Sequence, residues 1–260
     1  MALLPILTMA VGLAVASQPA PPMGKKTLPA PRVPVVVELF TSEGCSSCPS
    51  ADAALRELET AQSVPGVEVI ALGQHVDYWN RLGWKDPFSS AQFTERQRWY
   101  AEGFREGNYT PQAVVNGRYE FVGSERQTLA ETVAQAAQAP HATVALHRAA
   151  GMLHVQVSGL PAGTKAATVE LALTETGLSS QVGRGENSGR LLRHAAVVRT
   201  LRTLGAVGTD GTFHAAVPLG LNAAWKAENL RAVVLVQETA SHHIVGVGSL
   251  PLTIETAAVN

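Results

Sequence analysis

The sequence predicts an α/β protein in which a mixed sheet with flanking helices is followed by an all-β, sandwich-like C-terminal part. Two observations lead to this fold class. Up to about residue 139, runs with the twofold period of a strand alternate with runs that have the 3.6-residue period of a helix. Beyond that point, short β-type runs recur between clusters of Gly, Pro, Ser and Asn, with no convincing helix among them.

The first half follows the order strand, helix, strand, helix, strand, strand, helix. The strands are expected at residues 33–40, 67–72, 112–116 and 118–122, and the helices at 46–60, about 90–105 and 124–138. Asn116-Gly117 separates the last two strands, and this dipeptide is a strong indication of a tight hairpin turn. A βαβ unit followed by a helix and a hairpin predicts a mixed central sheet with helices on both faces.

The second half contains about seven β-type runs, which are typical of a β-sandwich. They cover Ala142–His147, Leu153–Val157, Thr168–Leu173, Leu191–Val198, Phe213–Val217, Ala232–Gln237 and Ile244–Leu250. A chain of 260 residues has room for one or two domains. We therefore predict one domain at 33–139 and a second at 140–260.

The N-terminal segment predicts export. Residues 1–16 form an apolar stretch that ends in Ala14-Val15-Ala16, a small-residue pattern that signal peptidase accepts, although no Lys or Arg precedes it. Residues 17–32 are rich in Pro and Ala and read as an extended spacer. We expect a secreted or periplasmic protein, with an uncleaved anchor or a lipid-tethered form as the alternative. Contact with a membrane is expected only if the segment is uncleaved.

The charge distribution excludes one class of partner. The formal net charge is −1, and the Lys and Arg residues are scattered rather than gathered into a basic patch. A nucleic-acid partner is therefore not expected.

The only two cysteines, Cys45 and Cys48, lie between an apolar strand-type run and a helical pattern. A helix N-terminus favours a thiolate over a thiol, and the spacing of two residues lets one thiol reach the other. This arrangement predicts an exchange site in which an exposed Cys45 attacks a partner and Cys48 resolves the mixed disulfide. A permanent disulfide or two idle thiols are the alternatives.

Several ordered motifs make the chain resemble a bacterial family of secreted thioredoxin-like proteins catalogued as a domain of unknown function. The N-terminal motifs are Glu38–Pro49, His75–Trp79, Gly83–Pro87, Thr94–Gln97 and Tyr109–Gln112, and the C-terminal ones are Gly185–Arg190, His194 and Val197–Arg199. The resemblance implies a thioredoxin-like mixed sheet in the first domain. It implies an activity, thiol–disulfide exchange with protein thiols or disulfides and a redox partner, only by analogy with the fold.

The resemblance also implies which residues surround the cysteine pair. Thr110-Pro111 matches the cis-proline turn that lies beside the cysteines in thioredoxin-like proteins and docks an extended substrate. The segment His75-Val76-Asp77-Tyr78-Trp79 follows the second parallel strand, and ligands of open α/β sheets gather at such strand ends. His75 or Asp77 can move protons, and Tyr78, Trp79 and Trp84 can form an apolar floor for a peptide. In the structural alternative, His75 and Asp77 anchor the loop by hydrogen bonds and the aromatic residues belong to the core.

A metal-binding alternative uses the same residues. Cys45, Cys48, His75 and Asp77 are ligand types that suit copper or zinc, but a second clear ligand pair is lacking, so we expect no metal. No cofactor is expected either, because Gly185–Arg190 lacks the ending of a phosphate loop. We interpret that segment as a loop that contacts the first domain.

The histidines of the second half are interpreted as strand residues rather than ligands. They are His147, His154, His194, His214 and the pair His242-His243, which a strand would direct to opposite faces. The leading hypothesis is thus an exported thiol–disulfide oxidoreductase that acts through Cys45 and Cys48. The alternative is a non-catalytic protein that binds copper, zinc or a partner with the same fold.

Overall fold

The structure, a computed structural model, describes residues 32–104 and 106–253. The predicted signal peptide and, apart from Arg32, the predicted spacer lie outside the described residues. Within the described ranges, no helix is both long enough and apolar enough to cross a bilayer.

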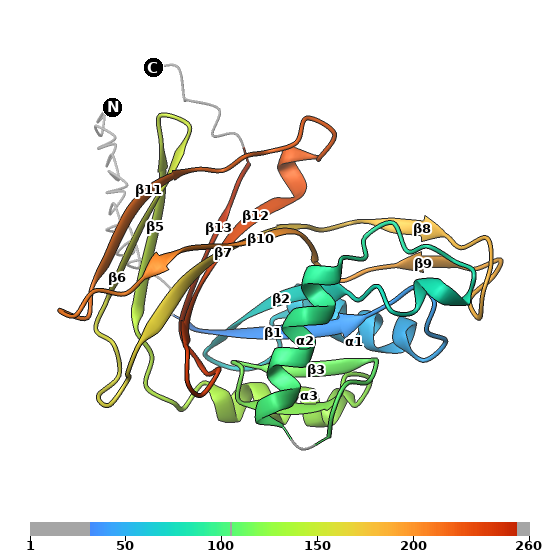
Figure 1. The fold of residues 1–260 in the computed structure, drawn as a ribbon, viewed down its shortest axis with the longest axis horizontal. Coiled ribbons are helices and arrows are strands. Elements are labelled where there is room, and N and C mark those ends of the chain that lie inside the picture. Colours follow the sequence, from blue (N-terminus) through green and yellow to red (C-terminus); the bar gives the residue numbers. More distant parts are fainter. Residues whose placement is uncertain (1–31, 105, 254–260) are drawn as a thin grey trace, which may run out of the picture. The chain divides into compact units, whose positions relative to one another are not determined.

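The first half has the predicted order of elements (Figure 1). These are β1 (Val33–Thr41), α1 (Cys48–Ala61), β2 (Val67–His75), the short 3-10 helix η1 (Asn80–Leu82), α2 (Ala91–Gly103), β3 (Gln112–Val115), β4 (Tyr119–Val122) and α3 (Arg126–Ala136). All seven predicted elements are present, and η1 is an addition within the long loop after β2.

The second half is β-rich, as expected. Its elements are β5 (Thr143–Ala149), β6 (Met152–Ser158), β7 (Ala167–Glu175), β8 (Ser179–Gln181), β9 (Leu191–Arg193), β10 (Val197–Ala206), β11 (Phe213–Pro218), the 3-10 helix η2 (Ala227–Asn229), β12 (Leu230–Glu238) and β13 (Ile244–Pro251). The single run expected at 191–198 is wrong, because the chain breaks after β9 and β10 continues to Ala206. The strand expected to hold His242 and His243 is wrong too, since His242 takes a left-handed φ of 64° in the turn between β12 and β13.

One mixed sheet of eight strands runs through both halves of the chain. Its strand order is β13-β12-β7-β10-β2-β1-β3-β4, so the sheet continues across the boundary expected near residue 140. β1 pairs with β2 in parallel over its whole length and with β3 in antiparallel fashion. The carboxyl ends of β1 and β2 therefore lie side by side, at Thr41 and His75.

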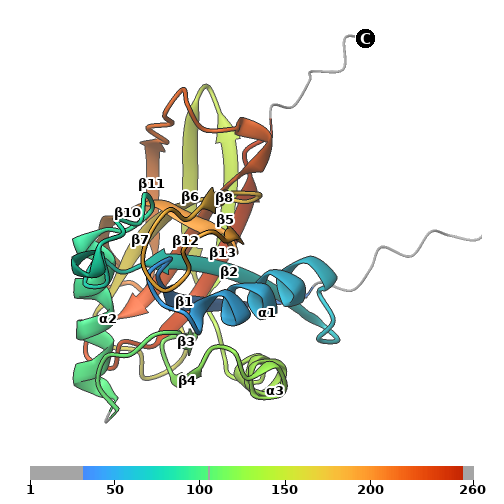
Figure 2. The ribbon, with the colours of Figure 1, turned by 90° about the vertical axis from the view of Figure 1, so that its right-hand side faces the viewer.

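The alternation along β1 divides its side chains between two layers. Val35, Val37 and Leu39 lie in the core that includes buried residues of α1 and α3, because successive side chains of a strand face opposite sides. Val36 and Phe40 lie in the cores that include α2 residues. Figure 2 shows α2 on one side of this part of the sheet and α1 on the other.

The two halves join where β2 meets the chain entering β10. Gly73 N–H donates to the carbonyl of Ala196 at 2.6 Å. A Cβ at residue 73 would lie 3.2 Å from that oxygen, so the absence of a side chain permits this approach.

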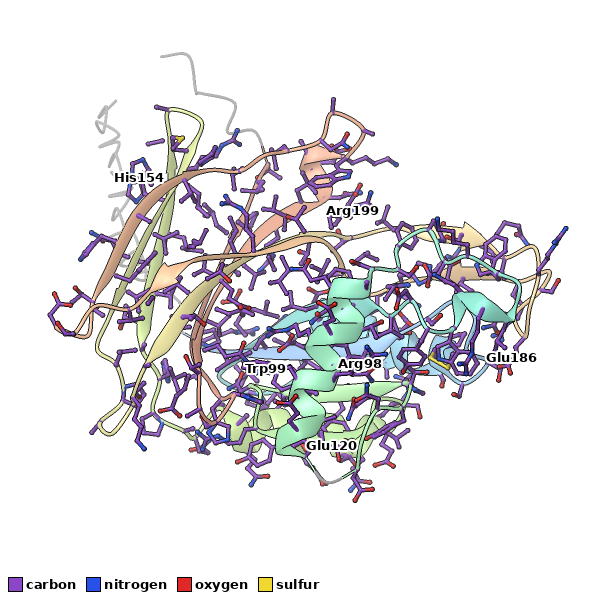
Figure 3. The ribbon with its side chains drawn as sticks, in the orientation of Figure 1. Arg98, Trp99, Glu120, His154, Glu186 and Arg199 are labelled. Carbon is purple, nitrogen blue, oxygen red and sulfur yellow. A yellow bond between two sulfur atoms is a disulfide. The ribbon has the colours of Figure 1, made fainter. Side chains whose placement is uncertain are left out.

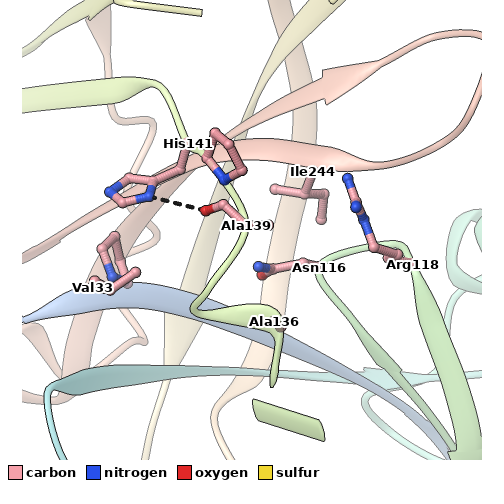
Figure 4. A pocket seen from close by; sticks show the side chains of 9 residues that line it. Val33, Asn116, Arg118, Ala136, Ala139, His141 and Ile244 are labelled. Atoms are coloured by element: carbon pink, nitrogen blue, oxygen red, sulfur yellow. Dashed lines mark hydrogen bonds between the residues drawn. The ribbon is translucent and has the colours of Figure 1, made fainter. Parts of the chain in front are cut away.

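The Asn116–Gly117 hairpin turn makes a second junction. Both residues have a positive φ, 46° and 62°, as a two-residue hairpin loop requires. A Cβ at Gly117 would lie 2.2 Å from the carbonyl oxygen of His242, so only glycine fits against the β12–β13 turn. Figure 4 shows the adjoining pocket, where Val33, Asn116 and Ile244 converge.

A separate three-stranded sheet, in the order β11-β6-β5, faces the C-terminal strands of the large sheet. Leu153, Val155 and Val157 of β6 share one buried cluster with residues of β7 and β12. This packing of two β-layers gives the β-rich region a sandwich-like core.

A buried ion network crosses the face of the large sheet that α2 covers. Arg96 of α2 donates from Nε and Nη2 to both carboxylate oxygens of Glu38 on β1, at 2.5 and 3.0 Å. Its Nη1 donates to Glu170 of β7 at 3.1 Å. Tyr100 donates to Glu38 and accepts from Gln237 of β12 at 2.8 Å. Although burial disfavours the guanidinium charge, these carboxylates keep the pKa of Arg96 above its usual value.

Replacing Arg96 with Met is expected to lower the free energy of unfolding by about 3–5 kcal/mol, because the carboxylate of Glu38 then stays buried without its cation. Urea unfolding of the purified protein measures this loss. Arg98→Met on the exposed side of α2 is the matched control and should cost less than about 0.5 kcal/mol. The double variant Glu38→Gln/Arg96→Met should recover part of the loss. Equal stability of Arg96→Met and Arg98→Met would contradict this role.

Candidate functional site

Cys45 and Cys48 form a disulfide where the chain leaves β1 and enters α1. The helix begins at Cys48, with Ser47 as its N-cap and Pro49 in its first turn. Cys45 was predicted in the first turn of the helix; it lies instead in the turn before it, where its N–H donates to Ser42. Cys48 therefore holds the first helical position, nearest the positive end of the helix dipole.

The disulfide is covered. Cys45 and Cys48 are each 1% exposed, whereas Ser46 and Ser47 between them are exposed. The expectation of an exposed Cys45 is thus wrong for this state of the protein.

The cover comes from the loop at residues 182–190, which joins β8 to β9. Asn187, itself fully buried, donates from Nδ2 to the carbonyls of Glu43 and Cys45, both at 2.9 Å. Glu186 accepts from the N–H of Ser46 at 2.9 Å, and Figure 3 shows it beside the two sulfur atoms. The prediction that this loop contacts the first half of the chain is confirmed, and the contact is with the turn that holds Cys45.

Thr110-Pro111, which is joined by a cis peptide bond, borders the same turn. Sγ of Cys45 lies 3.8 Å from the carbonyl oxygen of Thr110 and 3.4 Å from Oγ of Ser47. Thr110 is half-buried, so Cys45 is the cysteine that faces the rim of the site.

The residues predicted after β2 divide into two groups. Trp79 contacts the site, because its indole N–H donates to Oγ1 of Thr110 at 2.9 Å. Its Cβ also packs closely on Gly44, where an added Cβ would lie only 3.1 Å away. Tyr78 donates to Gln97 at 3.2 Å, and Asp77 accepts from Thr94 at 2.6 Å, both on α2. Asp77 thus anchors the loop to the helix, as in the structural alternative, and Tyr78 adds a second bond to the helix that was not predicted.

His75 points into a buried polar cluster. Its Nδ1 lies 2.7 Å from Oδ2 of Asp86, and its buried Nε2 has no hydrogen-bond partner within residues 32–104 and 106–253. Burial opposes the charge of Asp86, but His75 and the N–H groups of Glu43 and Phe88 hold the pKa of Asp86 below its usual value.

His194 enters this cluster from the chain between β9 and β10. Its Nε2 lies 3.0 Å from Glu43, its Nδ1 lies 3.8 Å from Asp52, and its ring centroid is 4.8 Å from that of His75. Burial lowers the pKa of the imidazole, but bonds to Asp52 and Glu43 outweigh it and raise the pKa of His194 to about 9.

Four residues of the site were not predicted as such: Asp52, Asp86, Asn187 and His194. Asp86, Asn187 and His194 all belong to motifs that carried the family resemblance, and Asn187 lies in Gly185–Arg190. The motifs alone do not show which residues contact one another in the fold. Asp52 follows Cys48 by four positions, the spacing that puts two residues on the same face of a helix. That spacing was the one usable indication.

The fold and the site together define a mixed α/β protein with a covered Cys-x-x-Cys disulfide above a buried histidine–carboxylate cluster. A model of the family described as "Protein of unknown function (DUF1223)" matches residues 36–237, so the chain belongs to the DUF1223 family. The chain is similar to an Agrobacterium tumefaciens protein of known crystal structure, with 31% sequence identity and a TM-score of 0.67. The match covers 83% of this chain and 93% of that one.

Two further matches are too distant to support an argument. The curli protein CsgC of Escherichia coli is 12% identical over 44% of this chain and 99% of its own, with a TM-score of 0.21. A domain of the outer membrane lipoprotein Omp28 from Porphyromonas gingivalis is 12% identical over 44% of this chain and 88% of its own, with a TM-score of 0.22. No curated protein matches the chain.

Asn187→Ala is expected to open the cover of the disulfide, because two buried carbonyls lose their donor at a cost of about 1–3 kcal/mol. If reduction proceeds through the open state, dithiothreitol should reduce the variant roughly tenfold faster than wild type. Mass spectrometry of alkylated samples over time measures the rate. Ser188→Ala, an exposed neighbour in the same loop, is the control, and equal rates for the two variants would contradict the covering role.

Proposed function

We propose that this protein is an exported thiol–disulfide oxidoreductase that acts through Cys45 and Cys48. The observation that carries the proposal is the disulfide at the carboxyl end of β1, with Sγ of Cys45 3.8 Å from the Thr110 carbonyl. Residues 33–139 are proposed to form a thioredoxin-like unit, in which an extended substrate pairs beside Thr110. Export is proposed from the apolar N-terminal segment of the sequence.

The exchange starts at Cys45, because Cys45 borders the half-buried Thr110 while Cys48 is built into the helix. When a substrate dithiol is oxidised, one substrate thiolate attacks Sγ of Cys45 and the bond to Cys48 breaks. Cys48 leaves as a thiolate near the positive end of α1 and takes up a proton. The second substrate thiolate then attacks the substrate sulfur of the mixed disulfide, and Cys45 is released. Two electrons pass to the cysteine pair, and the reverse sequence reduces a substrate disulfide.

The cover sets a condition on this chemistry. In-line attack on Cys45 needs the loop at residues 182–190 to move, since the loop bonds to the turn that holds Cys45 and this residue is only 1% exposed. The bonds that hold the loop over Cys45 come from the side chains of Glu186 and Asn187, so a substrate backbone can replace them.

Cys48→Ser is expected to trap a mixed disulfide between Cys45 and a model substrate, because the resolving thiol is missing. A peptide that contains one disulfide serves as the probe, and non-reducing mass spectrometry detects the adduct. Cys45→Ser is the matched control and should trap no adduct, since the remaining Cys48 is built into α1 and it is Cys45 that borders the half-buried Thr110. If Cys48→Ser forms no adduct and wild type neither oxidises nor reduces the peptide, the pair is a static bridge.

A further inference from the structure

The cluster beneath the disulfide contains more negative charge than its cations balance. Glu43, Asp52 and Asp86 are 1%, 3% and 1% exposed, so all three carboxylates are removed from water. Among the described residues, their ion-pair partners are His75 and His194 alone. Buried carboxylates without enough cations are costly, and a metal ion is one way to compensate them.

The two histidines are arranged as metal ligands usually are. His75 directs Nδ1 to Asp86 and His194 directs Nε2 to Glu43, at 2.7 and 3.0 Å. A metal-bound histidine typically donates its other N–H to a carboxylate in this way, which fixes the ring and makes the free nitrogen more basic. Within the described part of the chain, this leaves Nε2 of His75 without a partner, while Nδ1 of His194 lies 3.8 Å from Oδ1 of Asp52.

The two imidazole rings lie close to Asp52. One ligand atom each from Asp52, His75 and His194 lies within 4.8 Å of the others. The side chain of His75 is 1% exposed, and in the part of the chain that the structure describes its buried Nε2 has no hydrogen-bond partner. Buried polar atoms are normally hydrogen-bonded, so a ligand at this nitrogen would provide that partner.

We propose that Asp52, His75 and His194 form a binding site for a divalent transition-metal ion of the zinc class. Two imidazoles and a carboxylate suit such an ion, and they leave a position for a fourth ligand. Ligands on one zinc ion lie about 3.4 Å apart, so the most distant pair closes by up to about 1.4 Å on binding. The ion displaces a proton from Nδ1 of His194 to solvent, while Nε2–H still donates to Glu43.

This site is distinct from the exchange centre and from the cysteine ligands of the metal-binding alternative. Asp52 lies on α1 and His75 ends β2, whereas His194 precedes β10, so the ion joins three elements from both halves of the chain. It uses no sulfur atom, and the proposal goes beyond the redox function and does not depend on it.

The test is zinc binding by the full chain after treatment with EDTA and exchange into zinc-containing buffer. Elemental analysis should find one zinc per wild-type chain, and Co²⁺ in its place should give the visible bands of a four-coordinate ion. His194→Gln and Asp52→Asn should lower the zinc affinity at least tenfold, with circular dichroism showing that both variants are folded. Zinc should also raise the Tm of wild type and leave that of His194→Gln unchanged.

Two controls separate this site from the other places where zinc can bind. His147→Gln/His154→Gln removes a pair of stacked rings, the exposed His147 on β5 and the half-buried His154 on β6, with centroids 4.5 Å apart, and should still bind one zinc. Cys45→Ser/Cys48→Ser should bind one zinc as well, whatever the outcome of the exchange assay. The proposal is overturned if wild type binds no zinc, or if binding is lost in either control and kept in His194→Gln.

Discussion

The buried guanidinium of Arg96 is the interaction on which the rest of the structure depends. It bridges Glu38 on β1 and Glu170 on β7, strands from opposite halves of the chain. Arg96 and Glu38 are buried, Glu170 is half-buried, and the three charges bond to one another and to neighbouring polar side chains, so the positions of these groups are narrowly defined. The same face of α2 then positions the site, since Thr94 bonds Asp77 in the loop after β2 and Gln97 bonds the carbonyl of Tyr109 at 2.7 Å.

The site itself is shared between the halves of the chain. The first half supplies the disulfide and the Thr110 turn, and the second supplies the loop at residues 182–190 and His194. In the proposed exchange reaction, the opening of this loop adds to the barrier that an uncovered disulfide would present. The C-terminal β-rich region is therefore part of the candidate site.

The order of elements, the hairpin turn and the cysteine pair were predictable because each depends on local pattern: apolar period, Asn116-Gly117 and the spacing of Cys45 and Cys48. The cover of Cys45 and the pairing of His194 with Asp52 were not predictable, because both join residues that are far apart in the sequence. Cys45 and Asn187, for example, are joined by a hydrogen bond across 142 residues. The break between β9 and β10 was not predictable from the apolar pattern either. It depends on the bond between Ala196 and Gly73, a contact made across the sheet.

The reduction potential of the Cys45–Cys48 couple tests the central claim most directly. Equilibration of the full chain in glutathione and dithiothreitol buffers, followed by acid quenching, alkylation and mass spectrometry, gives the oxidised fraction at each potential. An exchange centre predicts a single two-electron transition with a midpoint between about −270 and −120 mV, the range of known thiol–disulfide oxidoreductases. A pair that stays oxidised below about −300 mV, as structural disulfides do, would contradict the account.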